Sequence, residues 1–102
     1  MARVGVSDLA DADTAKILDD LACDAGPLVA SDYNARIEAL YDRLANAPEG
    51  YQTRPKLGAN IHAGVVFPYL VIYRYQKADD TVSIIRVMDG RRNITRKFLR
   101  GG

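Results

Sequence analysis

The sequence predicts one α+β domain, residues 1–102, in which a helical hairpin packs on a mainly antiparallel sheet. Three observations support this. The 102 residues suffice for one hydrophobic core and leave no room for a second. Helical spacing of apolar residues is confined to the first half of the chain, and runs typical of strands fill the second. Because helices and strands are segregated, the order β-α-α-β-β-β favours α+β over parallel α/β.

The first elements are a short strand and a helix. Residues 3–7 alternate in the manner of a strand, and Ser7 then offers a helix N-cap. Apolar residues keep helical spacing as far as Ala25. Gly26-Pro27 suits the end of this helix and the first turn of the next, so the two helices are expected to form a tight hairpin.

The second helix has the clearest pattern in the chain. Its apolar residues fall at i, i+4, i+7, i+8 and i+11, namely Tyr33, Ile37, Leu40, Tyr41 and Leu44. A single stripe of this kind is typical of a helix face that packs on a core. Pro48 is expected to end the helix.

Three strands are predicted in the second half, at 60–66, 69–75 and 82–88, with a hairpin loop at 77–80. A short C-terminal helix is predicted at 93–100.

The middle strand of these three is apolar on both faces. Alternation places Tyr69, Val71, Tyr73 and Tyr75 on one face and Leu70, Ile72 and Arg74 on the other. One face is expected to cover the helical hairpin. The other is either capped by the terminal segment or left for a partner chain.

The net charge of +1 conceals an asymmetry between the two halves. Residues 1–50 hold four basic and ten acidic side chains, whereas residues 51–102 hold ten basic and three acidic ones. Such asymmetry indicates binding to nucleic acid or to an acidic partner. The alternative is that the basic residues only form a solvated face. The N-terminus lacks the long apolar stretch of a signal peptide, and no segment is apolar enough to span a membrane. We therefore expect a cytoplasmic protein.

Residues that could carry chemistry are few. His62 is the only histidine and has no nucleophile or zinc-ligand spacing around it, so a hydrogen-bonded structural role is expected. Cys23, the only cysteine, is expected to be a half-buried small hydrophobe. Gly58, Gly64 and Gly90 are interpreted as bend and turn glycines. We expect no metal and no cofactor.

The basic cluster near the C-terminus is the strongest candidate for a contact surface. It comprises Arg86, Arg91, Arg92, Arg96, Lys97 and Arg100. Guanidinium groups match both phosphates and carboxylates, so composition alone cannot separate a nucleic acid from an acidic protein. Asp89 is expected to orient Arg91 or Arg92.

Several motifs resemble those of RelE/ParE-type toxins. Tyr69-Leu-Val-Ile-Tyr-Arg-Tyr75 is similar to the Y-x-h-x-Y-R-h strand of ParE-like members. Ile85-Arg-Val-Met-Asp-Gly-Arg-Arg-Asn-Ile94 resembles their h-R-V-x-h-G-R-R-D-h ending. Gly26-Pro27, Leu44-Ala-Asn-Ala-Pro48 and Arg54-Pro-Lys-Leu-Gly58 also match. The likeness covers nearly the whole chain in order.

The resemblance implies a chromosomal or plasmid-borne toxin, of the kind also called a plasmid stabilisation protein, that forms a hetero-oligomeric complex with a cognate antitoxin. ParE-like members poison DNA gyrase, whereas RelE- or HigB-like members cleave mRNA on the ribosome. For a ParE-like toxin, the basic cluster would contact the target. The antitoxin-binding residues are predicted to be Tyr73, Arg74, Tyr75 and Arg86.

The residues that RelE-like nucleases use are mostly missing. Their two lysines fall near Gly58 and Asn60, and their third-strand arginine falls at Leu70. Their C-terminal tyrosine falls at Phe98, and only an arginine at Arg92 is retained. Phosphate chemistry needs charge stabilisation and proton transfer together. We therefore expect a non-enzymatic gyrase inhibitor, with a ribosome-dependent endoribonuclease as the alternative and a non-toxic antitoxin-binding module as a third possibility.

Overall fold

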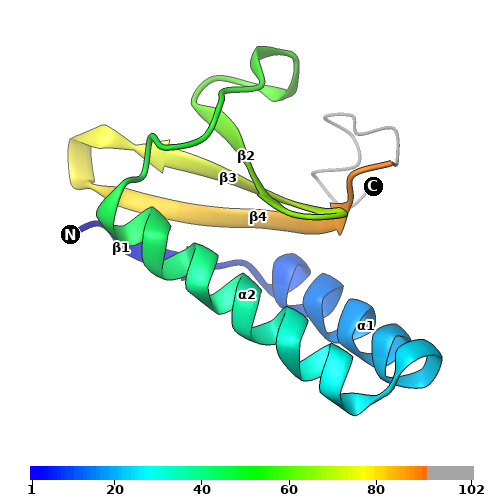
Figure 1. The fold of residues 1–102 in the computed structure, drawn as a ribbon. Coiled ribbons are helices and arrows are strands. Elements are labelled where there is room, and N and C mark those ends of the chain that lie inside the picture. The colour runs from blue at the N-terminus through cyan, green and yellow to red at the C-terminus, as the bar shows by residue number, and fades with distance from the viewer. Residues whose placement is uncertain (92–102) are drawn as a thin grey trace.

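The computed structural model of the protein describes residues 1–91. Its elements are β1 (Arg3–Val6), α1 (Asp8–Ala25), α2 (Pro27–Asn46), β2 (Ile61–Val66), β3 (Tyr69–Gln76) and β4 (Thr81–Asp89), with short 3₁₀ turns at Pro55–Leu57 and Lys77–Asp79. The predicted β-α-α-β-β-β order is confirmed, and the two helices form a hairpin below the sheet (Figure 1). The terminal helix predicted at 93–100 lies outside the described residues.

The sheet has the strand order β1-β4-β3-β2. Strands β2, β3 and β4 are antiparallel neighbours, while β1 joins β4 in parallel with Arg3 opposite Thr81 and Val6 opposite Ile84. The sheet is therefore mainly antiparallel, as predicted. Strand β4 lies between the first strand of the chain and β3, so it touches both halves of the sequence.

Helix α1 begins as the sequence predicts. The hydroxyl of Ser7 accepts a hydrogen bond from the Ala10 N–H at 3.0 Å and donates one to the Ile85 carbonyl at 2.8 Å. One side chain thus caps the helix and ties its first turn to β4. The helix ends at Ala25 and is capped by Gly26, whose φ of 96° suits glycine, and Pro27 then starts α2 without losing a hydrogen bond.

The predicted stripe of α2 forms much of the core. Ile37, Leu40 and Leu44 are buried, and Tyr33 and Tyr41 pack partly buried beside them. The inner face of the sheet meets this stripe through Val71 and Tyr73 of β3 and through Val82, Ile84 and Val87 of β4. The predicted division of the β3 faces is confirmed.

A bulge in β4 at Ile85 adjusts which side chains face the helices. Tyr73 is opposite Ile84, but its neighbour Ile72 is opposite Arg86, so Ile85 has no partner on β3. The extra residue lets Ile84 and Val87 both face the helices, although they are three positions apart. Ile85 instead packs on the outer face of the sheet, in a second cluster with buried Ile61, Ala63, Ile72 and Met88.

Two of the minor expectations need correction. Gly64 lies inside β2 opposite Val71 rather than at a bend. A Cβ on Gly64 would stand 3.1 Å from a methyl group of Leu40, so glycine is needed here because α2 approaches the sheet closely. Cys23 is exposed rather than half-buried, because its position on α1 faces away from the core.

The expected structural role of His62 is confirmed. Its ring stacks on Tyr73 with centroids 4.9 Å apart, and its Nδ1 lies 2.8 Å from the Tyr51 carbonyl, to which it donates. The Tyr73 hydroxyl donates to the Pro48 carbonyl at 2.9 Å. These bonds satisfy two buried polar side chains and fix the loop that joins α2 to β2.

Tyr73 should make stability depend on pH in the alkaline range. Burial raises the pKa of Tyr73 from 10.0 to about 12. Between these values the unfolded chain loses the phenol proton and the folded chain keeps it, so stability is full below pH 10 and falls as pH rises toward 12. The expected loss is about 2 kcal/mol. Denaturant unfolding of wild type and Tyr73→Phe at pH 9 to 12 checks this, and parallel curves would contradict it.

Candidate functional site

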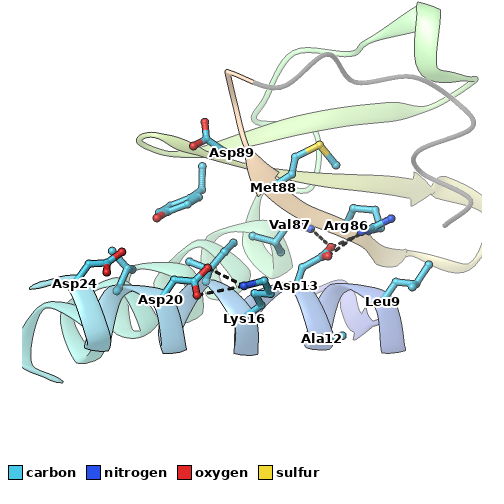
Figure 2. Close-up of a pocket in the computed structure, with 13 residues that line it drawn as sticks. Leu9, Ala12, Asp13, Lys16, Asp20, Asp24, Arg86, Val87, Met88 and Asp89 are labelled. Atoms are coloured by element: carbon cyan, nitrogen blue, oxygen red, sulfur yellow. Dashed lines mark hydrogen bonds and ion pairs between the residues drawn. The ribbon is translucent and has the colours of Figure 1, made fainter. Parts of the chain in front are cut away.

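A groove lies between α1 and the end of β4, with a volume of about 560 Å³ (Figure 2). Helix α1 contributes one wall, and β4 together with the start of β3 contributes the other. The lining residues are Leu9, Ala12, Asp13, Lys16, Ile17, Asp20, Leu21, Asp24, Tyr69, Arg86, Val87, Met88 and Asp89. We call this surface the α1–β4 groove.

An ion pair between Asp13 and Arg86 joins the two walls. The Arg86 Nε and one terminal nitrogen lie 2.7 and 2.8 Å from the two carboxylate oxygens of Asp13. Asp13 also accepts the Val87 N–H at 3.0 Å. The side chains of Arg86 and Asp13 are only 12% and 16% exposed, and the hydrogen bond to Asp13 raises the pKa of Arg86. Arg86, predicted to contact both target and antitoxin, is thus engaged within the protein.

The rest of the α1–β4 groove is apolar with an excess of negative charge. Its lining holds four carboxylates against two basic side chains. Lys16 pairs with Asp20 at 3.1 Å along α1. Tyr69 stands edge-on to Tyr33 with centroids 5.6 Å apart, and partial burial raises its pKa. Together these residues offer apolar contact to a partner and favour basic over acidic groups beside it.

Arg91 is the only member of the predicted basic cluster, besides Arg86, that lies within the described part of the chain. Its side chain is 80% exposed and pairs with Asp89 through two nitrogens, which raises its pKa. Asp89 therefore orients Arg91, as expected. Arg92, Arg96, Lys97, Arg100 and Phe98 lie outside the described residues.

The residues predicted to bind an antitoxin are not equally accessible. Tyr73 is completely buried, so we assign it to the core, and the expectation that it contacts a partner is corrected. The alternation that put Tyr73 on a sheet face could not show that α2 covers that face. Arg74 is exposed and lies near the Ala59 carbonyl. The Tyr75 hydroxyl donates to Asp80 at 2.8 Å, which raises its pKa.

A second candidate surface was not predicted from the sequence. Phe67 is 81% exposed at the turn between β2 and β3, and Val65 beside it is 50% exposed. The signal available was an apolar pair, Phe67-Pro68, at a position where turns usually carry polar residues.

Two classes of site are not found among residues 1–91. No group of His, Cys, Asp and Glu side chains there could hold a metal ion. None of the helices in this range is both long enough and apolar enough to span a membrane.

Comparison with known proteins decides the family. The family model of the ParE toxin of the type II toxin-antitoxin system, parDE, matches residues 4–94. The chain belongs to this family. The Toxin ParE3 of Caulobacter vibrioides is 33% identical over 82 residues, which is 80% of this chain and 80% of that protein.

Two solved structures share the fold of this ParE-family toxin. A chromosomal ParDE toxin–antitoxin system from P. aeruginosa matches with a TM-score of 0.71 at 19% identity, covering 87% of this chain and 96% of that one. The toxin–antitoxin complex RelBE2 from Mycobacterium tuberculosis matches with a TM-score of 0.63 at 20% identity, covering 86% and 96%.

In this ParE-family chain the backbone itself disfavours lysine at Gly58 and Asn60, the two positions onto which the resemblance to RelE-type toxins maps their lysines. Gly58 has a φ of 140°, which is accessible essentially to glycine alone. Asn60 has a φ of 60°, in the left-handed region that favours asparagine over long side chains. At the third position, Leu70 packs in the outer-face cluster beside Met88. None of these three residues carries a positive charge.

Proposed function

We propose that this toxin inhibits DNA gyrase by binding to it, without catalysing a reaction, and that a cognate antitoxin neutralises it. The observation that carries the proposal is the absence of basic side chains at Gly58, Asn60 and Leu70. A phosphodiester cleavage site needs such groups to stabilise charge in the transition state. A binding toxin needs none of them, and the ParE family model covers nearly the whole chain.

The α1–β4 groove is our proposed site for the antitoxin. It is a concave and partly apolar surface, of the kind that accepts an amphipathic helix. Its excess of carboxylates favours a helix that brings basic side chains. Arg86 contributes by holding Asp13 in place, and Arg74 and Tyr75 provide further exposed contacts on β3. Both solved relatives are toxin–antitoxin systems.

A supercoiling assay tests the proposal. Purified toxin added to gyrase and relaxed plasmid is expected to reduce supercoiling and to accumulate cleaved DNA on the enzyme, and co-purified antitoxin should restore activity. Heat-denatured toxin is the control. Full supercoiling at every toxin concentration, with no trapped DNA, would remove gyrase as the target.

The alternative function is ribosome-dependent cleavage of mRNA. It is favoured by the fold shared with the RelBE2 complex and by the arginine at Arg92. A translation extract given toxin separates the two functions. Cleaved message would establish the nuclease, and intact message at doses that stop growth would eliminate it.

A further inference from the structure

We propose that Phe67, at the turn between β2 and β3, is the main apolar contact through which this toxin binds its target. The target would present an apolar pocket bordered by carboxylates. The inference rests on the proposed function, in which the target is a protein. The surface, called here the hairpin-tip patch, has a hollow of about 280 Å³. Its residues are Arg36, Ala39, Arg43, Val65, Val66 and Phe67.

The first argument is that Phe67 is exposed while its backbone is held firmly. Val66 on one side is buried in the core and pairs with Tyr69 across the turn. Pro68 on the other side accepts the Gly90 N–H at 2.8 Å. A Cβ at position 90 would lie 3.0 Å from that carbonyl oxygen, so the glycine allows β4 to brace the turn. An aromatic side chain whose backbone is already fixed loses little conformational entropy on binding.

The second argument is charge. The lining of the hairpin-tip patch contains two arginines and no carboxylate. Arg36 pairs with Asp32 at 2.9 Å and lies over the Tyr33 ring, whereas Arg43 makes no ion pair within residues 1–91. An apolar centre with arginine at its edge is the composition of an interface hot spot.

The third argument is continuity with the predicted basic cluster. The described chain ends at Arg91, one residue after the Gly90 that bonds to the hairpin turn. In Figure 1 the end of β4 lies beside the turn between β2 and β3. Phe67 therefore lies next to the point from which the sequence continues into Arg92, Arg96, Lys97 and Arg100.

The patch fits a protein better than nucleic acid. Four of its six lining residues are apolar, a composition that suits a protein surface better than a phosphate backbone. It also fits the target better than the antitoxin. It shares no residue with the α1–β4 groove, which is the larger surface and is proposed for the antitoxin.

Matched substitutions test the inference in the full-length toxin. Phe67→Ser is expected to raise the toxin concentration needed for half-maximal growth arrest and for gyrase inhibition by about 10-fold or more. Arg43→Glu is expected to raise it several-fold. The control is Leu28→Ser, because Leu28 is similarly exposed, at 85% against 81%, but lies at the start of α2. The control should behave as wild type, and all variants should keep the wild-type melting temperature and antitoxin binding.

The outcomes are distinct from those of the supercoiling assay. If wild type fails to inhibit gyrase but Phe67→Ser still abolishes growth arrest, the role of Phe67 in target binding is supported and gyrase is rejected as the target. Growth arrest by Phe67→Ser at wild-type doses overturns this role. Loss of antitoxin binding with toxicity retained also overturns it, since the patch would then serve the antitoxin. Salt-sensitive DNA binding that Arg43→Glu weakens and Phe67→Ser does not would overturn it in favour of nucleic acid.

Discussion

Replacing Asp13 with alanine is expected to lower the free energy of unfolding by about 3 kcal/mol, the low end of the cost of removing one partner of a buried ion pair. Asp13 holds the Arg86 guanidinium through two hydrogen bonds and accepts the Val87 N–H as well. Its removal leaves a largely buried cation and a backbone donor without this partner. Urea unfolding monitored by circular dichroism gives the measurement.

The control for Asp13 is on the same helix. Asp20 also forms an ion pair, with Lys16, but its side chain is 60% exposed. Asp20→Ala should therefore cost less than about 0.5 kcal/mol. The double variant Asp13→Leu with Arg86→Met should recover most of the loss, since it removes both charges together. Equal stability of Asp13→Ala and Asp20→Ala would show that the buried Asp13–Arg86 pair contributes no more to stability than the exposed Lys16–Asp20 pair.

Leu40→Ala is expected to cost about 3 kcal/mol, because a fully buried leucine leaves a cavity between α2 and β2. Gly64→Ala should cost about 1–2 kcal/mol for the opposite reason, since its methyl group would press on the same leucine at 3.1 Å. The two substitutions should not be additive, because the new methyl group fits into the space that Leu40→Ala opens. Chemical denaturation of both single variants and the double variant measures the coupling.

The exposed Leu28, also on α2, serves as the control for this set. Leu28→Ala should change stability by less than about 0.5 kcal/mol. Strict additivity of Leu40→Ala and Gly64→Ala would contradict the close contact between the helix and the strand.

Local patterns were enough to predict much of the fold. The stripe that includes Ile37, Leu40 and Leu44 indicated which face of α2 is buried, and Ser7 and Gly26 marked the ends of α1, because spacing and capping depend on residues close in sequence. The two apolar faces of β3 followed from alternation in the same way.

Features that depend on distant residues could not be predicted. Arg86 was interpreted as a free contact residue because its partner Asp13 lies 73 positions away. The bulge at Ile85, which shifts the side chains that follow it, leaves no mark in the alternation of β4 alone. The close approach of Leu40 to Gly64 and the exposure of Phe67 likewise depend on how α2 lies across the sheet.

The central place of β4 has a consequence for synthesis of the toxin. β4 is made last of the four strands, yet it pairs with both β1 and β3, and its Ile85 carbonyl accepts a hydrogen bond from the Ser7 hydroxyl. While residues 81–89 are still on the ribosome, β1 therefore has no strand to pair with. The helical hairpin also lacks the part of its packing surface that β4 supplies. At this stage the chain cannot form the α1–β4 groove, nor can Gly90 brace the turn at Phe67. The surfaces proposed here for the target and for the antitoxin therefore form together, once β4 has been synthesised and has joined the sheet.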